Sequence, residues 1–311
     1  MLVLSRRINW CENRALRRIS AAVAAAQRCV VRSGSMNNPD TEPQLRQSDT
    51  VLWVVGAAGG IGSQLALAGA ERGFRLVLSG GAPQELAALA ERCGGSARAI
   101  VVPLDLTSTI SLSSAVDAAI AAFGQVNVLA LNAGISQRAL AVETDYPVLE
   151  RIIQIDFLSQ AEIARRVASH MMDGPAKGGA ILVVSSLAGL VGTPQRTGYC
   201  AAKHAIFGYY NSLRAELVEH GVTVTIGVPG FVRTDISRNA VTAAGASYGK
   251  MDPNQQGGRD PDYVARRMLQ ATLRGRREIR LAMGLKGRLA IFLSRHVPAL
   301  FARIIARARV T

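Results

Sequence analysis

The sequence predicts an α/β protein with a doubly wound parallel sheet of about seven strands in three layers, and three observations support it. Short apolar runs alternate with longer stretches at helical spacing from Val51 onward. The chain has 311 residues and is 49% hydrophobic, which suits one large domain with a buried core. A glycine-rich turn follows the first apolar run. Because crossovers between parallel strands are long and right-handed, helices must cover both faces of the sheet.

The expected elements alternate in order along the chain. Strands are expected at Val51–Val55, Arg75–Ser79, Ala99–Pro103, Val126–Leu131, Ala180–Ser185, Val222–Val228 and near Ile279–Ala282. Helices are expected to include Gln84–Arg92, Leu112–Phe123, Tyr146–Met172 and Tyr199–His220. Such a sheet binds ligands beyond the carboxyl ends of its strands, so functional motifs should directly follow strands.

The net charge of +14 is unevenly distributed. Residues 1–35 carry a net charge of +6 and residues 266–311 carry +11, which leaves −3 for the rest of the chain. A nucleic-acid reader usually clusters positive charge on its folded domain and interleaves aromatic residues, which make up only 5% here. We therefore expect no nucleic-acid partner.

Three parts of the chain are expected. Residues 1–49 form a basic extension and linker, 50–283 the folded domain, and 284–311 a basic amphipathic tail. The Arg-rich, acid-poor residues 1–35 are either a mitochondrial-type transit segment or a non-native extension before Met36. The four cysteines have no metal-ligand or redox spacing, so we expect no metal site and a reducing compartment. The protein is thus expected in the cytoplasm, or in mitochondria if the first segment is a transit peptide.

A glycine-rich turn, Gly56-Ala57-Ala58-Gly59-Gly60-Ile61-Gly62, follows the first strand and opens a helix. Glycines permit a tight turn and close approach of the backbone to a ligand. The helix N-terminus offers free N–H groups and the positive end of a dipole to a pyrophosphate. The alternative is an ordinary glycine turn, but the flanking strand and helix favour a phosphate site.

A second motif places Tyr199 and Lys203 four residues apart on one predicted helix, with Ser186 at the end of the preceding strand. Residues at i and i+4 share a helix face, so the ammonium can lower the phenol pKa from its usual value of about 10. Tyrosine then becomes an acid/base near neutral pH. A lone pair of this kind would more often be a solvated helix face, but the serine and the glycine turn argue against that.

Together these segments resemble the short-chain dehydrogenase/reductase family, in its single-domain branch with a Tyr-x-x-x-Lys motif. The resemblance runs from about Val51 to Met283 and implies a Rossmann-type sheet. It assigns cofactor binding to residues in the glycine turn, after the third and fourth strands, on the catalytic helix and after the sixth strand. These are Gly56, Gly60, Ile61, Gly62, Asp105, Leu106, Asn132, Ala133, Gly134, Tyr199, Lys203, Pro229, Gly230, Val232 and Thr234.

The same resemblance implies the reaction. A hydride would pass between a nicotinamide cofactor and a carbonyl or secondary alcohol, while Tyr199 transfers the proton and Ser186 holds the substrate oxygen. Lys203 would assist Tyr199 and bind the nicotinamide ribose. The alternatives are a cofactor-binding protein of the same fold with little or no turnover, and an adaptor that works through its tails. Relatives suggest a homodimer or homotetramer formed through Tyr146–Met172 and Tyr199–His220.

Three positions depart from the family pattern. Val55 replaces a threonine and Leu131 replaces the first asparagine of its segment. Asp156 replaces the family's fourth catalytic residue, an asparagine that helps to bind a water in the proton relay. The aspartate could substitute structurally or pair with Lys203 and change the pH profile, unless it is simply a solvated helix residue.

The sequence gives less information on the choice between NAD and NADP and on the substrate than on the catalytic residues. Gly80 and Gly81, after the second strand, offer neither the acid typical of NAD-preferring relatives nor the basic residue of NADP-preferring ones. NADP and NAD both stay open, and family habit favours NADP. The stretches Gly192–Gln195 and Ser237–Asp260 should form a mobile substrate lid. The tail Lys286–Val310 alternates arginine with apolar residues, which suits an anionic membrane surface or packing on the body or a partner subunit.

Overall fold

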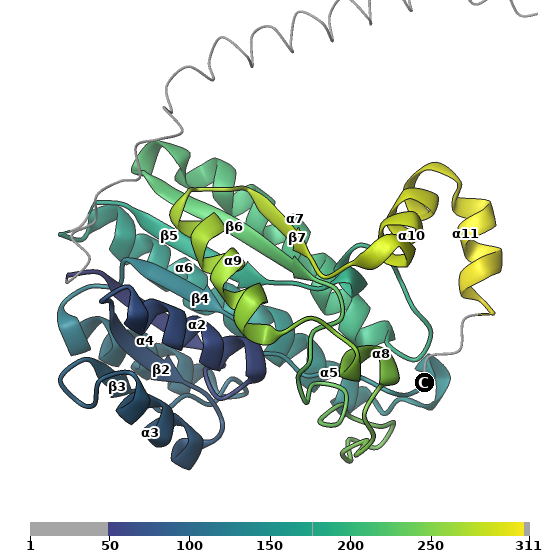
Figure 1. Ribbon diagram of the computed structural model, residues 1–311, viewed down its shortest axis with the longest axis horizontal. Coiled ribbons are helices and arrows are strands. Elements are labelled where there is room, and N and C mark those ends of the chain that lie inside the picture. The colour runs from purple at the N-terminus through teal and green to yellow at the C-terminus, as the bar shows by residue number, and fades with distance from the viewer. Residues whose placement is uncertain (1–48, 176, 308–311) are drawn as a thin grey trace, which may run out of the picture. The chain divides into compact units, whose positions relative to one another are not determined.

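The computed structural model describes residues 49–175 and 177–307, and the structural statements below concern these residues. The basic extension at the N-terminus, with its two interpretations, lies outside them. Seven parallel strands form one sheet in the order β3-β2-β1-β4-β5-β6-β7, with helices on both faces (Figure 1). The predicted fold class is confirmed.

The strands lie within two residues of the expected bounds. They are β1 (Val51–Val55), β2 (Arg75–Ser79), β3 (Ala99–Val101), β4 (Val128–Leu131), β5 (Gly179–Val184), β6 (Val222–Pro229) and β7 (Glu278–Leu281). Val55, the last residue of β1, pairs with Ser79 at the end of β2 and with Leu131 at the end of β4. The chain reverses its direction across the sheet between β1 and β4, so their carboxyl ends border a crevice.

Two hydrophobic cores fill the space between the sheet and its helices. Helices α2 (Gly60–Glu71), α3 (Pro83–Arg92) and α9 (Pro261–Leu273) pack on one face. Helices α4 (Thr109–Phe123), α6 (Ser159–Asp173) and α7 (Thr197–Leu217) pack on the other. Figure 1 shows α2 and α9 in front of the strands. Because both faces are covered, the strands are almost continuously apolar rather than alternating.

The expected helix Tyr146–Met172 is helical throughout but contains a wider turn in its middle. The chain instead forms α5 (Tyr146–Ile153), a π-helical turn η3 (Gln154–Leu158) and then α6. Beside this turn, the side-chain amide nitrogen of Gln160 lies within hydrogen-bond distance of the carbonyl oxygens of Ala133 (2.7 Å), Ile155 (3.1 Å) and Asp156 (3.2 Å). These bonds satisfy carbonyls that the wider turn displaces from the regular helical pattern.

The remaining elements are short or lie near the C-terminus. They are η2 (Ala141–Glu143), η4 (Leu187–Gly189), η5 (Val218–His220), α8 (Pro253–Gln256), α10 (Gly284–His296) and α11 (Pro298–Ile305). One face of α10 packs on the body, since Ile291 is buried and a Cβ at Gly287 would contact Leu187. Within residues 49–175 and 177–307, no helix is both long and apolar enough to cross a bilayer.

Candidate active site

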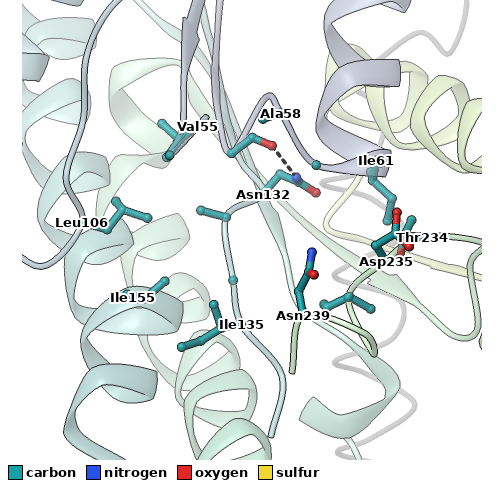
Figure 2. A pocket seen from close by; sticks show the side chains of 18 of the residues that line it. Val55, Ala58, Ile61, Leu106, Asn132, Ile135, Ile155, Thr234, Asp235 and Asn239 are labelled. Carbon is teal, nitrogen blue, oxygen red and sulfur yellow. Dashed lines mark hydrogen bonds between the residues drawn. The ribbon is translucent and has the colours of Figure 1, made fainter. Parts of the chain in front are cut away.

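A cavity of about 630 Å³ opens at the carboxyl ends of β1 and β4. The glycine turn forms one wall of the cavity, which Gly56, Gly60 and Ile61 line. Leu106 and Ile155 bound one side, while Thr234, Asp235 and Asn239 bound the other (Figure 2). The cavity lies where the sheet topology predicts a ligand site.

The glycines of the turn serve two different purposes. Gly56 has a φ of +84°, and a Cβ there would lie 2.6 Å from the backbone nitrogen of Ala133, so only glycine fits. A Cβ at Gly62 would lie 2.0 Å from the carbonyl oxygen of Gly56. Gly62 does not line the cavity, and its missing side chain permits tight packing of α2 on the turn.

The residues predicted after β3 and β4 form the cavity wall. Asp105, Leu106, Asn132, Ala133 and Gly134 all line it. The Asn132 amide donates to the carbonyl oxygen of Gly56 (3.0 Å), which ties the two segments together (Figure 2). Asp105 is exposed, and hydrogen bonds from the Thr107 hydroxyl and N–H keep the pKa of its carboxyl below the ordinary value.

A second cavity, of about 150 Å³, adjoins the first. Ser186, Tyr199 and Lys203 line it, so the structure brings the predicted catalytic set together. The two cavities share Ile61, Asn132, Gly134, Thr234 and Ile236. Pro229, Gly230 and Val232, predicted after β6, also line the second cavity.

Backbone contacts fix the side chains of the predicted catalytic set. Lys203 Nζ donates to the carbonyl oxygen of Val184 (3.2 Å) and lies 5.7 Å from the centre of the Tyr199 ring. Ser185 Oγ donates to the carbonyl oxygen of Lys203 (3.0 Å), which joins β5 to α7. Ser186 Oγ accepts the N–H of Ala188 (3.2 Å), so its own proton stays available for a substrate oxygen.

Asp156 is buried behind Lys203 and lines neither cavity. Its Oδ2 lies 3.3 Å from Lys203 Nζ, and its Oδ1 accepts the N–H of Ile135 (2.7 Å). The interpretation as a solvated helix residue is therefore wrong, and of the remaining alternatives the structure shows the pairing with Lys203. Burial raises the pKa of the Asp156 carboxyl, while the charge of Lys203 opposes that rise.

The π-helical turn also changes what the Asp156 backbone can do. Its carbonyl oxygen accepts a hydrogen bond from Gln160 (3.2 Å). That oxygen keeps a second lone pair, so it can still accept one further hydrogen bond.

Sequence reasoning missed two arginines that line the second cavity. Arg138 lies four residues after the Asn132–Gly134 segment, and Arg196 lies three residues before Tyr199. Both contact Asp252, which belongs to the predicted lid Ser237–Asp260. Their nearness in sequence to the Asn132–Gly134 segment and to Tyr199 was the signal that could have identified them as site residues.

The predicted lid is more regular than expected. It pairs through the bridges Gln137–Val241, Val232–Arg259 and Val241–Ser247, and it contains α8. Ser237 and Gln255 from this stretch and Thr193 from the other line the second cavity. The segment therefore contributes polar side chains at fixed positions, which its mixed composition did not indicate.

Comparisons with known proteins identify the class. The family model described as short chain dehydrogenase matches residues 50–245. The chain is 32% identical to dehydrogenase/reductase SDR family member 7B of Bos taurus over 269 residues, covering 84% of this chain and 82% of the relative. The protein therefore belongs to the short-chain dehydrogenase/reductase family of oxidoreductases, as its motifs predicted.

Particular relatives add detail. The chain is 38% identical to dehydrogenase/reductase SDR family member 7 of Mus musculus over 206 residues, which cover 64% of this chain and 60% of that relative. The match thus spans less than two thirds of the mouse protein. A crystal structure of a family member from Burkholderia phymatum in complex with NAD superposes with a TM-score of 0.72 at 22% identity, over 86% of this chain and 98% of that one. This last likeness concerns the fold.

Proposed function

We propose that the protein transfers a hydride between a nicotinamide cofactor and a carbonyl or secondary alcohol, with Tyr199 as general acid/base. The observation that carries the proposal is the convergence of Ser186, Tyr199 and Lys203 on a cavity that adjoins the one beneath the glycine turn. A cofactor in one cavity and a substrate in the other would meet at their shared residues. The Burkholderia relative was crystallised in complex with NAD, which agrees with this arrangement.

The residues of the larger cavity fit a dinucleotide. A Cβ at Gly60 would lie 2.6 Å from Thr234 Cγ2, so the glycine keeps the N-terminus of α2 accessible between turn and wall. That N-terminus would hold the pyrophosphate, and Asp105 and Leu106 would flank the adenine. Lys203 and the segment Pro229–Thr234 would hold the nicotinamide ribose and carboxamide. The cofactor supplies hydride chemistry when bound.

The side chains supply proton transfer and orientation. The Ser186 hydroxyl donates to the substrate oxygen, and the Tyr199 hydroxyl gives or takes the proton at the same oxygen. Lys203 Nζ lies 5.7 Å from the centre of the Tyr199 ring, and the carbonyl of Val184 fixes its position. Tyr199 is only 6% exposed, so bulk water competes little for this proton.

Removing the tyrosine hydroxyl tests the mechanism. We expect Tyr199→Phe to lower kcat by about 100-fold or more, because a positioned acid/base contributes about that much. Steady-state rates on ketones and secondary alcohols with each cofactor would measure the loss, and Tyr263→Phe, a half-exposed tyrosine of α9, is the control. Unchanged turnover in Tyr199→Phe would contradict the mechanism. Cofactor binding without turnover in the wild type would support the non-catalytic alternative.

NADP is the proposed cofactor, with NAD as the alternative. The absence of an acid at Gly80 and Gly81, both of which line the larger cavity, supports NADP. Glu85 of α3 also lines that cavity and would repel a 2′-phosphate. We expect Glu85→Gln to raise kcat/KM for NADP relative to NAD severalfold, and an unchanged ratio would place this carboxylate outside the 2′-site.

A homodimer or homotetramer through α5, α6 and α7 is proposed. Leu149 of α5 and Leu158 of η3 are partly exposed apolar side chains on this surface, 36% and 47% exposed. Light scattering of the eluting protein should give two or four copies, and Leu158→Lys should reduce that number if the surface is an interface.

Peripheral membrane contact through α10 and α11 is also proposed. Leu285, Leu289, Phe292, Leu300 and Ile304 are exposed on this helix pair, among basic residues such as Arg288 and Arg295. Flotation with anionic liposomes tests it. Phe292→Asp combined with Leu300→Asp should abolish binding, whereas Val142→Asp, an exposed apolar site elsewhere, should not.

A further inference from the structure

Three charged residues from separate segments meet beside the catalytic tyrosine. Arg138 follows β4, Arg196 precedes α7, and Asp252 precedes α8. Both arginines line the smaller cavity together with Ser186 and Tyr199. The proposed proton transfer uses none of the three.

A single carboxylate oxygen serves both arginines. Asp252 Oδ2 lies 3.2 Å from an Nη atom of Arg138 and 3.1 Å from one of Arg196. The other oxygen, Oδ1, accepts the backbone N–H and the side-chain amide of Asn254 (2.9 and 3.2 Å). The aspartate is 3% exposed, so its contacts with the two arginines are shielded from solvent and hold them in place.

The group retains one uncompensated positive charge. The Arg138 and Arg196 side chains are only 2% and 16% exposed, and one aspartate balances two guanidinium groups. Burial lowers the pKa of Arg138, and the neighbouring charge of Arg196 lowers it further, while Asp252 opposes both effects. The Lys203–Asp156 pair beside Tyr199 is balanced and supplies no anion to this group.

Each arginine also has an Nε–H donor without a hydrogen-bond partner among the described residues. Arg138 Nη1 donates to Ser136 Oγ (3.2 Å) and to the carbonyl oxygen of Gln137 (3.0 Å). The Nε groups of Arg138 and Arg196 are buried and have no hydrogen-bond partner within the described part of the chain. Buried charge and unsatisfied donors are costly unless a ligand compensates them.

We propose that Arg138 and Arg196 form an anion subsite of the substrate cavity, and that the substrate is a small carbonyl compound or alcohol that carries a carboxylate. The inference rests on the proposed function. A monoanion would balance the single excess charge, and the planar fork of a guanidinium suits the two oxygens of a carboxylate. The cavity of about 150 Å³ is smaller than the roughly 300–1,000 Å³ of sites for drug-sized ligands, so the acid must be small.

Matched pairs of substrates test the subsite. A series of aldehyde acids of increasing chain length would be compared with the primary amides of the same acids, which have nearly the same shape but no charge. We expect at least one acid to exceed its amide in kcat/KM by about tenfold or more, the effect of one hydrogen bond between charged groups. Calorimetric titration of the corresponding hydroxy acids and hydroxy amides should show the same preference without turnover.

Variants assign the preference to the arginines. Arg196→Gln should reduce the acid-to-amide ratio to near one and leave turnover of the amides measurable. Arg138→Gln should do the same, and Arg196, the less buried of the two, keeps the test valid if that variant does not fold. Arg238→Gln is the matched control, because Arg238 lies in the same loop region but its side chain is 57% exposed.

The outcomes separate the two proposals. Equal kcat/KM for acids and amides across the series, or equal affinity in calorimetry, would overturn the anion subsite while leaving the oxidoreductase function intact. A preference for acids that persists in both arginine variants would also overturn it. Acid-selective binding without turnover of any member would support the subsite and contradict the proposed reaction.

Discussion

Two buried charge clusters flank Tyr199 and differ in their balance. Lys203 and Asp156 form a one-to-one pair in which both side chains are almost fully buried. Arg138 and Arg196 share one aspartate, Asp252. Paired charge in the interior mainly positions groups, whereas surplus charge has to be stabilised by something that binds. The Lys203–Asp156 pair can therefore position the lysine, while the cluster of Arg138, Arg196 and Asp252 can bind a ligand in the same site.

Removing the carboxylate of Asp252, which both arginines share, should have the largest effect, and this effect is on the free energy of unfolding. Asp252→Asn keeps an oxygen that can cap α8 but leaves two buried guanidinium groups without an anion. We expect it to lower the free energy of unfolding by about 3 kcal/mol, as when one partner of a buried pair is lost. Urea denaturation would measure the change.

An exposed counterpart gives the matched control. Asp260 also caps a helix and contacts an arginine, Arg233, but it is 53% exposed. Asp260→Asn should cost less than about 1 kcal/mol. Equal losses in the two variants would show that the buried cluster contributes no more than a surface pair.

Neutralising the aspartate of the balanced pair should have a smaller effect, seen in the pH profile. Asp156→Asn removes a negative charge 3.3 Å from Lys203 Nζ, so more of the lysine's charge acts on Tyr199. We expect the pH midpoint of kcat to move down by about one unit, equivalent to about 1.4 kcal/mol. Steady-state kinetics across pH would detect this, with the exposed Asp117→Asn as control. An unmoved midpoint would contradict an electrostatic effect of the Asp156 carboxylate on the proton transfer.

The sequence predicted the catalytic set but not the unbalanced cluster, for a physical reason. Ser186, Tyr199 and Lys203 lie within 18 residues, on one strand end and the helix that follows, so local spacing suffices. Arg138 and Asp252 are separated by 114 residues and meet only after the lid packs on the loop following β4. No local period encodes such a contact.

A similar limit explains the helix that was predicted as continuous. Strand positions were predictable because apolar runs between turn residues mark buried parallel strands. The π-helical turn is accompanied by a hydrogen bond from Gln160 to the carbonyl of Ala133, 27 residues away. That contact leaves no trace in the helical periodicity of the sequence. The π-helical turn at Gln154–Leu158 could therefore not be predicted from the periodicity.

A surface pair should show the smallest effect and complete the comparison. Glu162 contacts Arg165 and Arg166 on α6, and the hydrogen bond from Arg165 contributes most to lowering its pKa to about 2. Its folded pKa is below the unfolded value of about 4.3, so the stabilisation is present above that pH and is lost as pH falls through about 2.

We expect Glu162→Gln to cost about 0.5 kcal/mol at pH 7, because solvent screens this half-exposed pair. The cost should shrink progressively when urea denaturation is repeated at pH 4 and pH 3. Glu219→Gln, an exposed glutamate after α7, is the control and should change little at any pH. A cost near that of Asp252→Asn, or one that does not fall with pH, would mean that burial is not what separates the charge clusters beside Tyr199 from ordinary surface pairs.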